Sequence, residues 1–334
     1  MKPYFETKNG KLYNMDCLEM LRQMPENSID WCITSPPYWG LRDYGVDGQL
    51  GNESTPEEYV NKMVEVFREV KRIMADDGVL FLNLGDSYAN SGISQPQRDT
   101  SGGFGGKDKG TRGEQGYANA SGSGVSKSIP AGLKPKDLVG IPWLCAFALR
   151  ADGWYLRQDI IWHKPNPMPE SVTDRCTKSH EYMFLLSKSQ TYYFDHEAIK
   201  EPFADKRMGN PGKYKWHYGE GAHGHTQGIG KKEWNSDGYI TGRNKRSVWT
   251  VNTKPNKEAH FATYPEELII PCVKTSKPRA VILDPFMGSG TTAMVAEKYG
   301  RQWLGAELNP DYCAIAAKRI KKASEQFGLF EGKR

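Results

Sequence analysis

The sequence predicts an α/β fold built around one sheet. Apolar runs of strand length alternate along the chain with stretches of helical periodicity. Near the C-terminus, a glycine-rich turn at residues 288–290 joins one such strand to a helix. Too few residues follow this turn to complete a sheet of this kind. The remaining strands must therefore come from the N-terminal half of the chain.

Composition describes a soluble protein with ample material for a buried core. The chain of 334 residues is 38% hydrophobic and 25% charged, which excludes a membrane-embedded protein. Its first residues lack the apolar stretch of a secretory signal, so we expect a cytoplasmic location and no membrane partner. The six cysteines lie far apart with no CxxC pair, so neither a disulfide framework nor a metal site is expected.

Two strands and a helix are predicted at the N-terminus. Residues 11–24 indicate a short strand followed by a helix in which Leu18, Leu21 and Met24 share one face. The next strand ends at Thr34, where two consecutive prolines stop regular structure.

A capped helix and a buried strand come next. Thr55 provides an N-cap, Pro56 a first-turn proline and Glu58 a capping-box acid for a helix through about Met74. The predicted apolar face consists of Val60, Met63, Val64, Phe67, Val70 and Ile73. The run 79–88 indicates a buried strand that ends in a loop.

The middle of the chain contains an insertion and then regular structure. Residues 90–130 are so rich in Gly and Ser that they cannot bury enough surface to fold alone, which predicts a flexible insertion. A helix is expected from Pro135 to about Ala151. Further elements are expected as a strand at 155–163, a hairpin-like pair at 181–188 and 190–195, a strand at 280–284, a helix at 291–300, a strand at 302–308 and a helix at 311–326.

Positive charge is concentrated in one segment. The net charge is only +5, yet residues 202–260 contain eleven Lys or Arg against five Asp or Glu, interleaved with aromatic residues. Such a segment is typical of nucleic-acid binding, and its alternative is a solvated lobe that reads no base. The candidate phosphate contacts are Lys213, Lys215, Lys231, Lys232, Arg243, Lys245 and Arg246.

The glycine-rich turn has the chemistry of a ligand site. Glycines let the backbone approach a ligand, and the N-terminus of the following helix offers free N–H groups to a carboxylate or phosphate. Glu307 ends the next strand, where an acid can accept hydrogen bonds from a ribose diol. The turn also fits the dinucleotide fingerprint, so alone it does not separate NAD from S-adenosylmethionine, and a plain packing turn stays open.

The second candidate element is the run Ser35, Pro36, Pro37 and Tyr38. Two prolines remove two backbone donors and leave carbonyl oxygens and the Ser35 hydroxyl as acceptors in fixed directions. Such a rim suits an exocyclic amino group, whose nitrogen could then attack a methyl sulfonium while Tyr38 stacks on the base. The alternative is a tight turn with a core tyrosine.

Together, SPPY after an early strand and DPFMGSGTT after a late one resemble the beta group of amino-DNA methyltransferases. Segments 15–17, 85–88, 162–165, 180–182 and 261–267 match this family as well. These enzymes use S-adenosylmethionine to make N4-methylcytosine or N6-methyladenine. The resemblance implies a Rossmann-like class I S-adenosylmethionine-dependent methyltransferase fold with permuted motif order and an inserted target-recognition region.

The resemblance also assigns roles. It implies catalysis by Ser35, Pro36, Pro37 and Tyr38. It implies cofactor binding by Asp16, Cys17, Phe261, Thr263, Pro265, Asp284, Phe286, Gly288, Gly290, Thr291, Thr292 and Glu307, with Glu307 on the ribose and Asp16 near the adenine amine. Asp86 either orients the Ser35 hydroxyl or caps a loop.

The serine before the two prolines favours cytosine N4 over adenine N6, because Asp or Asn is commoner there in adenine enzymes of the resembled family. The target base must leave the duplex to reach such a site. Cys272 lacks the motif context that would make it a covalent nucleophile, so we expect a buried thiol there.

The domain assignment follows from these matches. Residues 1–89 are assigned to the catalytic part, 90–130 to the insertion, 131–201 to the continued methyltransferase domain, 202–260 to DNA target recognition and 261–334 to the cofactor part. Double-stranded DNA is the expected partner; a cognate restriction endonuclease and a monomer or homodimer stay open. The rival hypotheses are an NAD-dependent oxidoreductase, an inactive DNA-binding protein, and an RNA or protein amide methyltransferase.

Overall fold

The computed structural model describes residues 1–41, 45–46, 48–89, 129–202, 242–254 and 264–331, with side chains to residue 326. Most of the predicted insertion at 90–130 therefore lies outside the described residues. The same holds for 203–241 and 255–260 of the basic segment. No helix of the described ranges is long and apolar enough to cross a membrane.

Within the described residues, one nine-stranded sheet organises the protein. Its strands are β1 (Phe5–Glu6), β2 (Gly10–Asn14), β3 (Ile29–Thr34), β4 (Met74–Leu84), β5 (Tyr155–His163), β6 (His180–Ser187), β7 (Val248–Thr250), β8 (Val281–Asp284) and β9 (Gln302–Glu307). Their order is β1-β2-β9-β8-β3-β4-β6-β5-β7. β2, β9, β8, β3 and β4 are parallel, and β6 is antiparallel to both its neighbours. The C-terminal strands β8 and β9 thus lie between β2 and β3 of the N-terminal half. The prediction that all remaining strands come from that half is correct for β1 to β5 but wrong for β6 and β7, which lie in the second half of the chain.

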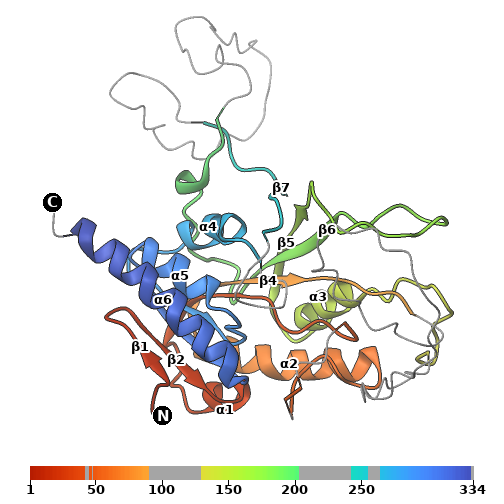
Figure 1. Ribbon diagram of the computed structural model, residues 1–334, viewed down its shortest axis with the longest axis horizontal. Coiled ribbons are helices and arrows are strands. Elements are labelled where there is room, and N and C mark those ends of the chain that lie inside the picture. Colours follow the sequence, from red (N-terminus) through yellow and green to blue (C-terminus); the bar gives the residue numbers. More distant parts are fainter. Residues whose placement is uncertain (42–44, 47, 90–128, 203–241, 255–263, 332–334) are drawn as a thin grey trace, which may run out of the picture.

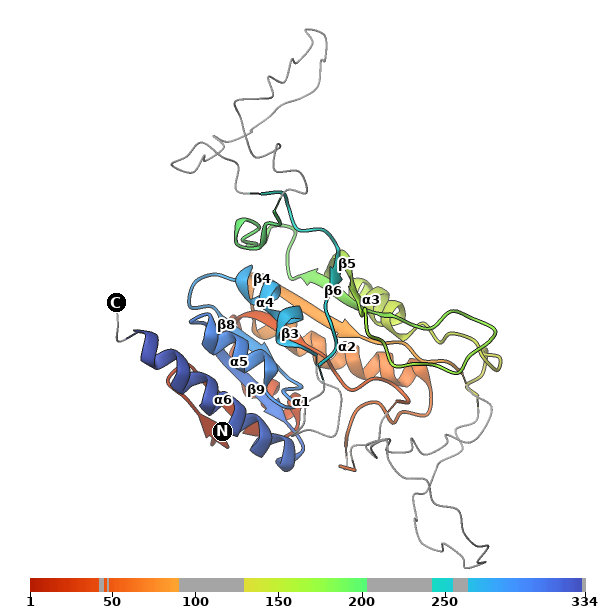
Figure 2. The same ribbon diagram turned by 45° about the horizontal axis from the view of Figure 1, so that its top comes forward.

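Helices cover both faces of the sheet (Figures 1 and 2). The helices are α1 (Cys17–Arg22), α2 (Pro56–Ile73), α3 (Ile141–Ala151), α4 (Glu266–Lys274), α5 (Thr291–Lys298) and α6 (Pro310–Glu331), with a short 3-10 helix, η1 (Glu197–Ile199). Buried residues of α1, α2 and α3 pack in one core cluster, and those of α4, α5 and α6 pack in the other. The result is a three-layer α/β arrangement with a core on each side of the sheet.

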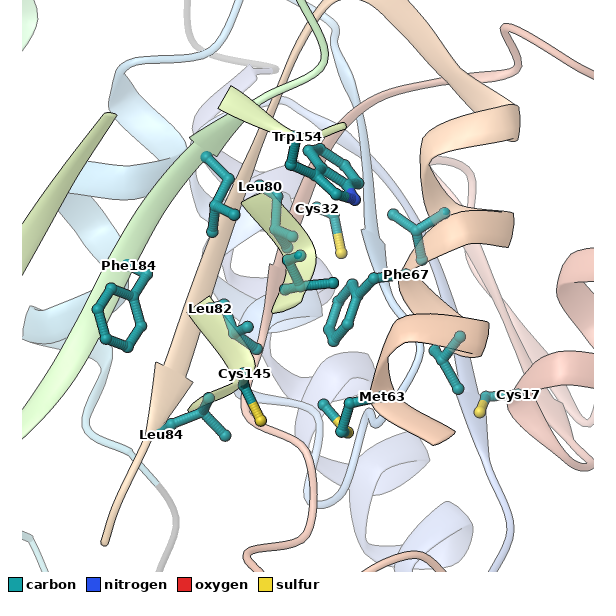
Figure 3. Close-up of a cluster of buried hydrophobic side chains, with 14 of the residues drawn as sticks. Cys17, Cys32, Met63, Phe67, Leu80, Leu82, Leu84, Cys145, Trp154 and Phe184 are labelled. Carbon is teal, nitrogen blue, oxygen red and sulfur yellow. The ribbon is translucent and has the colours of Figure 1, made fainter. Parts of the chain in front are cut away.

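Residues 79–84 of strand β4 form an almost continuous apolar run because both faces of the sheet are covered there. Leu80 and Leu82 belong to the first core cluster, whereas Val79 and Phe81 belong to the second. Successive side chains point to opposite faces, and here both faces are covered by helices. Figure 3 shows the first cluster, in which side chains of α2 and α3 gather around β4.

Helix α2 begins as its sequence predicts. The Thr55 hydroxyl accepts a hydrogen bond from the Glu58 amide (3.2 Å), and Pro56 is in the first turn. The Glu58 carboxylate accepts from the amide of Ser54 (3.0 Å), one residue before the N-cap. Of the predicted apolar face, Met63, Phe67, Val70 and Ile73 are buried, while Val60 and Val64 are only half-buried and Tyr59 and Val66 are buried in their place. The buried face therefore extends to Tyr59, whose hydroxyl donates to the Pro37 carbonyl (2.8 Å).

Thr55→Ala is expected to lower the free energy of unfolding by about 1 kcal/mol, because the Glu58 amide loses its acceptor. Ser54→Ala is the matched control, since Ser54 takes part through its backbone only and should change the stability by less than about 0.5 kcal/mol. Urea unfolding of both variants measures the difference. Equal effects of the two substitutions would contradict the capping role of Thr55.

Four predicted elements differ clearly from the structure, one of them being α6, which extends to Glu331 instead of residue 326. Helix α3 begins at Ile141 instead of Pro135, because Gly140 adopts a left-handed φ of 84° and the preceding residues form turns. β4 begins at Met74 rather than residue 79, since Met74 pairs with Ile29 ahead of an irregularity in the ladder. Residues 190–195 form no strand: β6 is paired with β4 and β5 on its two edges, which leaves no edge for a hairpin partner.

Candidate active site

A cavity of about 350 Å³ opens at the edge of the sheet that is formed by the ends of its strands. β2, β3, β4, β5, β8 and β9 end at this edge, and the antiparallel strand β6 begins there. The loops after β3 and β8 are neighbours because the register pairs Cys32 with Leu283. The carboxyl ends of parallel strands are the usual ligand-binding edge of such a sheet. The two motifs singled out in the sequence therefore meet at one cavity.

Most of the predicted site residues line this cavity. They are Asp16, Cys17, Ser35, Pro36, Pro37, Tyr38, Phe286, Gly288, Thr291 and Glu307. Four others are described but are not part of its lining, namely Pro265, Asp284, Gly290 and Thr292. Phe261 and Thr263 lie outside the described residues.

The glycine-rich turn after β8 needs its glycines for conformation and for space. Gly288 and Gly290 have φ values of 52° and 83°, which lie in the left-handed region. A Cβ on Gly290 would come within 3.1 Å of the Ala316 Cβ on α6. Gly290 is the N-cap of α5, so the turn presents the N-terminus of that helix next to the cavity.

Glu307 holds the turn through hydrogen bonds of its carboxylate. One carboxylate oxygen accepts from the Gly288 amide and the other from the Asn309 amide, each at 2.8 Å. Burial raises the pKa of this carboxyl, and the backbone donors oppose that rise. Each oxygen keeps a further lone pair that can accept a hydroxyl of a ligand.

The start of α1 contributes a second acid and a thiol. Asp16 is the N-cap of α1, and its carboxylate accepts from the Glu19 amide (3.0 Å). The neighbouring Cys17 is buried, and burial raises the pKa of its thiol to about 12. The thiol therefore stays protonated and acts as a small apolar part of the wall.

Asp284 lies behind the cavity wall. One oxygen of its fully buried carboxylate accepts from the Thr34 hydroxyl (2.7 Å) and the Phe286 amide (3.1 Å). The other accepts from the hydroxyls of Thr292 (2.7 Å) and Tyr264 (3.0 Å). Burial raises the pKa of Asp284, while these donors lower it. The side chain thus joins β3, α5 and the segment before α4, and it acts on the cavity from outside its lining.

The Ser35 loop carries a directed set of hydrogen bonds. The Ser35 hydroxyl donates to the Tyr38 hydroxyl (3.3 Å), which donates in turn to the Glu181 carboxylate (2.8 Å). The Tyr38 hydroxyl also lies 3.0 Å from the Asn83 side-chain oxygen. Gly85 makes room for the ring, because a Cβ there would come within 2.5 Å of the Tyr38 Cε2.

Sequence reasoning missed several residues of the site, and four of them matter for its hydrogen bonds and charge. Asn83, Lys164, Glu181 and Tyr264 all line the cavity. Glu181 forms an ion pair with Lys164, whose ammonium lies 4.2 Å from the centroid of the Trp162 ring. A polar residue inside the otherwise apolar run 79–84 was the available signal for Asn83. Lys164, Glu181 and Tyr264 were within segments that matched the resembled family, but no role was attached to them.

Asp86 does not orient Ser35. Its carboxylate accepts from the amides of Ser87 (2.9 Å), Gly140 (3.0 Å) and Ile141 (3.1 Å). Two of these donors belong to the start of α3, which would otherwise lack acceptors. The alternative role, a cap, is the one that the structure supports.

Three of the predicted phosphate contacts converge on one acid. Arg243 and Lys245 lie 3.6 Å from the Glu201 carboxylate, and Arg246 lies 3.1 Å from it. Arg246 remains largely exposed. The other four, Lys213, Lys215, Lys231 and Lys232, lie outside the described residues. Cys272 is buried in α4, as expected, and burial raises the pKa of its thiol.

Comparison with known proteins identifies relatives over most of the chain. Residues 29–318 match the family model of N6/N4 methyltransferases, described as DNA methylase. The type II methyltransferase M.Cfr9I of Citrobacter freundii is 45% identical over 319 residues, which cover 95% of this chain and 89% of that protein. M.SmaI, a type II methyltransferase of Serratia marcescens, is 42% identical over 314 residues, covering 94% and 91%.

Solved structures show the same fold at low sequence identity. The PvuII DNA methyltransferase, which is cytosine-N4-specific, has a TM-score of 0.61 at 18% identity, with 97% of this chain and 93% of that one covered. A putative DNA modification methylase of Thermus thermophilus, in complex with S-adenosyl-L-methionine, has a TM-score of 0.54 at 22% identity, covering 94% and 93%. The predicted class I methyltransferase fold is confirmed.

Proposed function

Because this chain belongs to the N6/N4 family of DNA methylases, we propose that it transfers a methyl group from S-adenosylmethionine to the exocyclic N4 amine of cytosine in duplex DNA. The observation that carries the proposal is the cavity itself. It places the acceptor groups of the Ser35 loop beside the glycine-rich turn and Glu307. An amine and a methyl donor could therefore occupy neighbouring parts of one site.

The residues of the turn fit S-adenosylmethionine. The Thr291 hydroxyl is buried in the first turn of α5 and has no hydrogen-bond partner among the described residues, although Thr291 lines the cavity. A ligand carboxylate at the helix N-terminus would satisfy it. Glu307 has acceptor capacity for a ribose diol, and Asp16 for an adenine amine. The cofactor, when bound, supplies an electrophilic methyl group.

The Ser35 loop would orient the amine. Its two prolines have no backbone N–H group. The loop therefore presents oxygen acceptors to the cavity without backbone donors that would oppose the N–H groups of an amine. The Ser35 oxygen can accept a hydrogen bond from the amine because its own proton is directed to Tyr38. Holding the amine by its hydrogens points the nitrogen lone pair toward the methyl carbon. Stacking of the target base on the Tyr38 ring requires that the base leave the duplex.

The choice of cytosine rests on Ser35. In the resembled family a serine before the two prolines is commoner in cytosine-N4 enzymes, and the PvuII enzyme named as cytosine-N4-specific shares the fold. Both bases present an amine beside a ring acceptor, so adenine N6 is the alternative product. The type II names of the relatives support a place in a restriction-modification system. The exposed Arg246 supports contact with DNA phosphates.

Analysis of the methylated nucleoside tests the proposal. Purified protein is incubated with isotopically labelled S-adenosylmethionine and bacterial genomic DNA that lacks methylated amines, and the digested nucleosides are analysed by mass spectrometry. We expect label in N4-methylcytosine. Label in N6-methyladenine would contradict the choice of base and keep the reaction. Absence of label from DNA, with label in RNA or protein, would contradict the proposed function.

A further inference from the structure

Three side chains connect the proposed amine site with a carboxylate. The Ser35 hydroxyl is 3.3 Å from the Tyr38 hydroxyl, and the Tyr38 hydroxyl is 2.8 Å from Glu181. All three residues line the cavity. They come from two distant parts of the chain, the loop after β3 and the start of β6, which the strand order β3-β4-β6 brings together.

The direction of these hydrogen bonds is set by the groups at the far end. An ionised Glu181 can only accept, so the Tyr38 proton points to it. The Asn83 nitrogen donates to the Tyr182 carbonyl (2.9 Å), which leaves the Asn83 oxygen, also an acceptor, toward Tyr38. The Tyr38 oxygen is thus free to accept from Ser35. The Ser35 oxygen in turn keeps its lone pairs for a donor in the cavity, such as an amine.

Methylation of an amine leaves one proton too many on nitrogen. As the bond from nitrogen to the methyl carbon forms, the bond from that carbon to sulfur breaks and its electron pair goes to sulfur. The product nitrogen then carries a positive charge until it loses a proton. Within the proposed function, that proton needs an acceptor within hydrogen-bond reach of the amine.

We propose that Ser35, Tyr38 and Glu181 form a proton relay that takes this proton from the methylated amine to the Glu181 carboxylate. The Ser35 oxygen accepts the proton from nitrogen and passes its own proton to the Tyr38 oxygen. Tyr38 passes its proton to Glu181. Both hydroxyls end the step neutral, the nitrogen loses its positive charge and the carboxylate loses its negative charge. The inference rests on the proposed amine methylation, and it holds for cytosine or adenine.

The surroundings suit these roles. Burial, and next the Glu181 charge, raise the pKa of Tyr38 well above its ordinary value, so Tyr38 relays a proton as a neutral hydroxyl. Lys164 pairs with the second Glu181 oxygen, and both side chains are only 17% exposed. Lys178 and His180 also act on Glu181 electrostatically. The Glu181 oxygen that accepts from Tyr38 is therefore not the one that pairs with Lys164.

The other carboxylates near the cavity have different partners. Asp86 accepts the amides that begin α3, and Asp284 accepts four donors behind the wall. Glu307 accepts two amides beside the glycine-rich turn. Among the described residues that line the cavity, Glu181 is the carboxylate that is hydrogen-bonded to the Ser35 loop.

The test measures single-turnover methylation on DNA that the wild-type protein methylates. Glu181→Gln keeps the size of the side chain but cannot take up the proton, so we expect the rate to fall about 100-fold while the Kd for S-adenosylmethionine changes less than about twofold. Tyr38→Phe keeps the ring and breaks the relay, with a similar fall expected. Because both act on one path, the double variant should be no more than about threefold slower than either single one.

The pH profile adds a readout that a structural role would not move. The wild-type rate should fall as acid protonates Glu181, and Glu181→Gln should lack this acid limb because an amide does not titrate in this range. Glu181→Asp, which restores a carboxylate, should recover part of both the rate and the limb. Glu170→Gln is the matched control, since Glu170 is ion-paired with Arg175 on the segment between β5 and β6 and does not line the cavity.

Several results would overturn the relay. They are a Glu181→Gln rate within about threefold of wild type, an acid limb that survives in that variant, or multiplicative losses in the double variant. If Glu181→Gln fails to fold because Lys164 loses its partner, Tyr38→Phe decides alone, and a rate within about threefold of wild type rejects the relay. A wild-type protein that methylates no nucleic acid contradicts the proposed function; normal wild-type methylation with unaffected variants contradicts the relay only.

Discussion

Ser35→Ala is expected to slow the single-turnover transfer of the methyl group about 1000-fold, with less than a twofold change in the Kd for S-adenosylmethionine. The substitution removes the hydroxyl that would accept from the amine and also the donor to Tyr38. The Ser35 hydroxyl is not part of the glycine-rich turn, so cofactor binding should be unaffected. Rapid-quench kinetics with labelled cofactor give the rate, and calorimetric titration gives the Kd.

Ser87→Ala is the control for Ser35→Ala. Ser87 lies in the loop after the neighbouring strand β4, its hydroxyl has no hydrogen-bond partner among the described residues, and it does not line the cavity. Its removal should leave the rate within about twofold of wild type. A Ser35→Ala enzyme that loses rate and cofactor affinity to the same degree would show that Ser35 supports the cavity in general rather than the amine.

For elements with strong local signals, the predicted first and last residues were close to the observed ones. The strand at 155–163 was predicted with its observed bounds, and the helix that Thr55 and Pro56 begin ends one residue before the predicted Met74. The start of α3 could not be found in this way, because it depends on Asp86, which lies more than fifty positions before Gly140 and accepts its amide. Capping by a residue far away in the sequence leaves no local pattern to detect.

The site was predictable only where its chemistry is contiguous in sequence. Ser35, Tyr38 and the glycine-rich turn are recognisable by residue type and by their place at strand ends. Glu181 is not recognisable in this way, since its contact with Tyr38 arises from the pairing of β4 with β6. That pairing joins segments far apart in sequence and depends on the tertiary structure. Asp284 was predicted to bind the cofactor, but its hydrogen-bond partners come from three other segments and place it outside the cavity lining.

Asp284→Ala is expected to lower the free energy of unfolding by about 3–5 kcal/mol, because several buried donors lose their shared acceptor. The hydroxyls of Thr34, Thr292 and Tyr264 would be left in a dry environment next to the Ser35 loop. Asp30→Ala is the matched control: the Asp30 carboxylate accepts one amide, that of Val281, and should cost about 1 kcal/mol. Equal losses in urea unfolding would contradict the central position of Asp284.

The raised pKa of Asp284 also predicts the direction in which the stability of the protein changes with pH. Burial raises the pKa of Asp284 in the folded protein, so between the ordinary value of about 3.9 and the folded value the native state binds more protons than the unfolded state. The stability that this proton binding contributes is fully present below about pH 4 and is lost as the pH rises through the folded pKa. Asp284→Asn cannot titrate, so the stability of wild type relative to this variant should decrease from pH 4 to pH 7. A relative stability that instead increases over this range would mean that the donors lower the pKa of Asp284 by more than burial raises it. The buried carboxylate would then be ionised throughout this range.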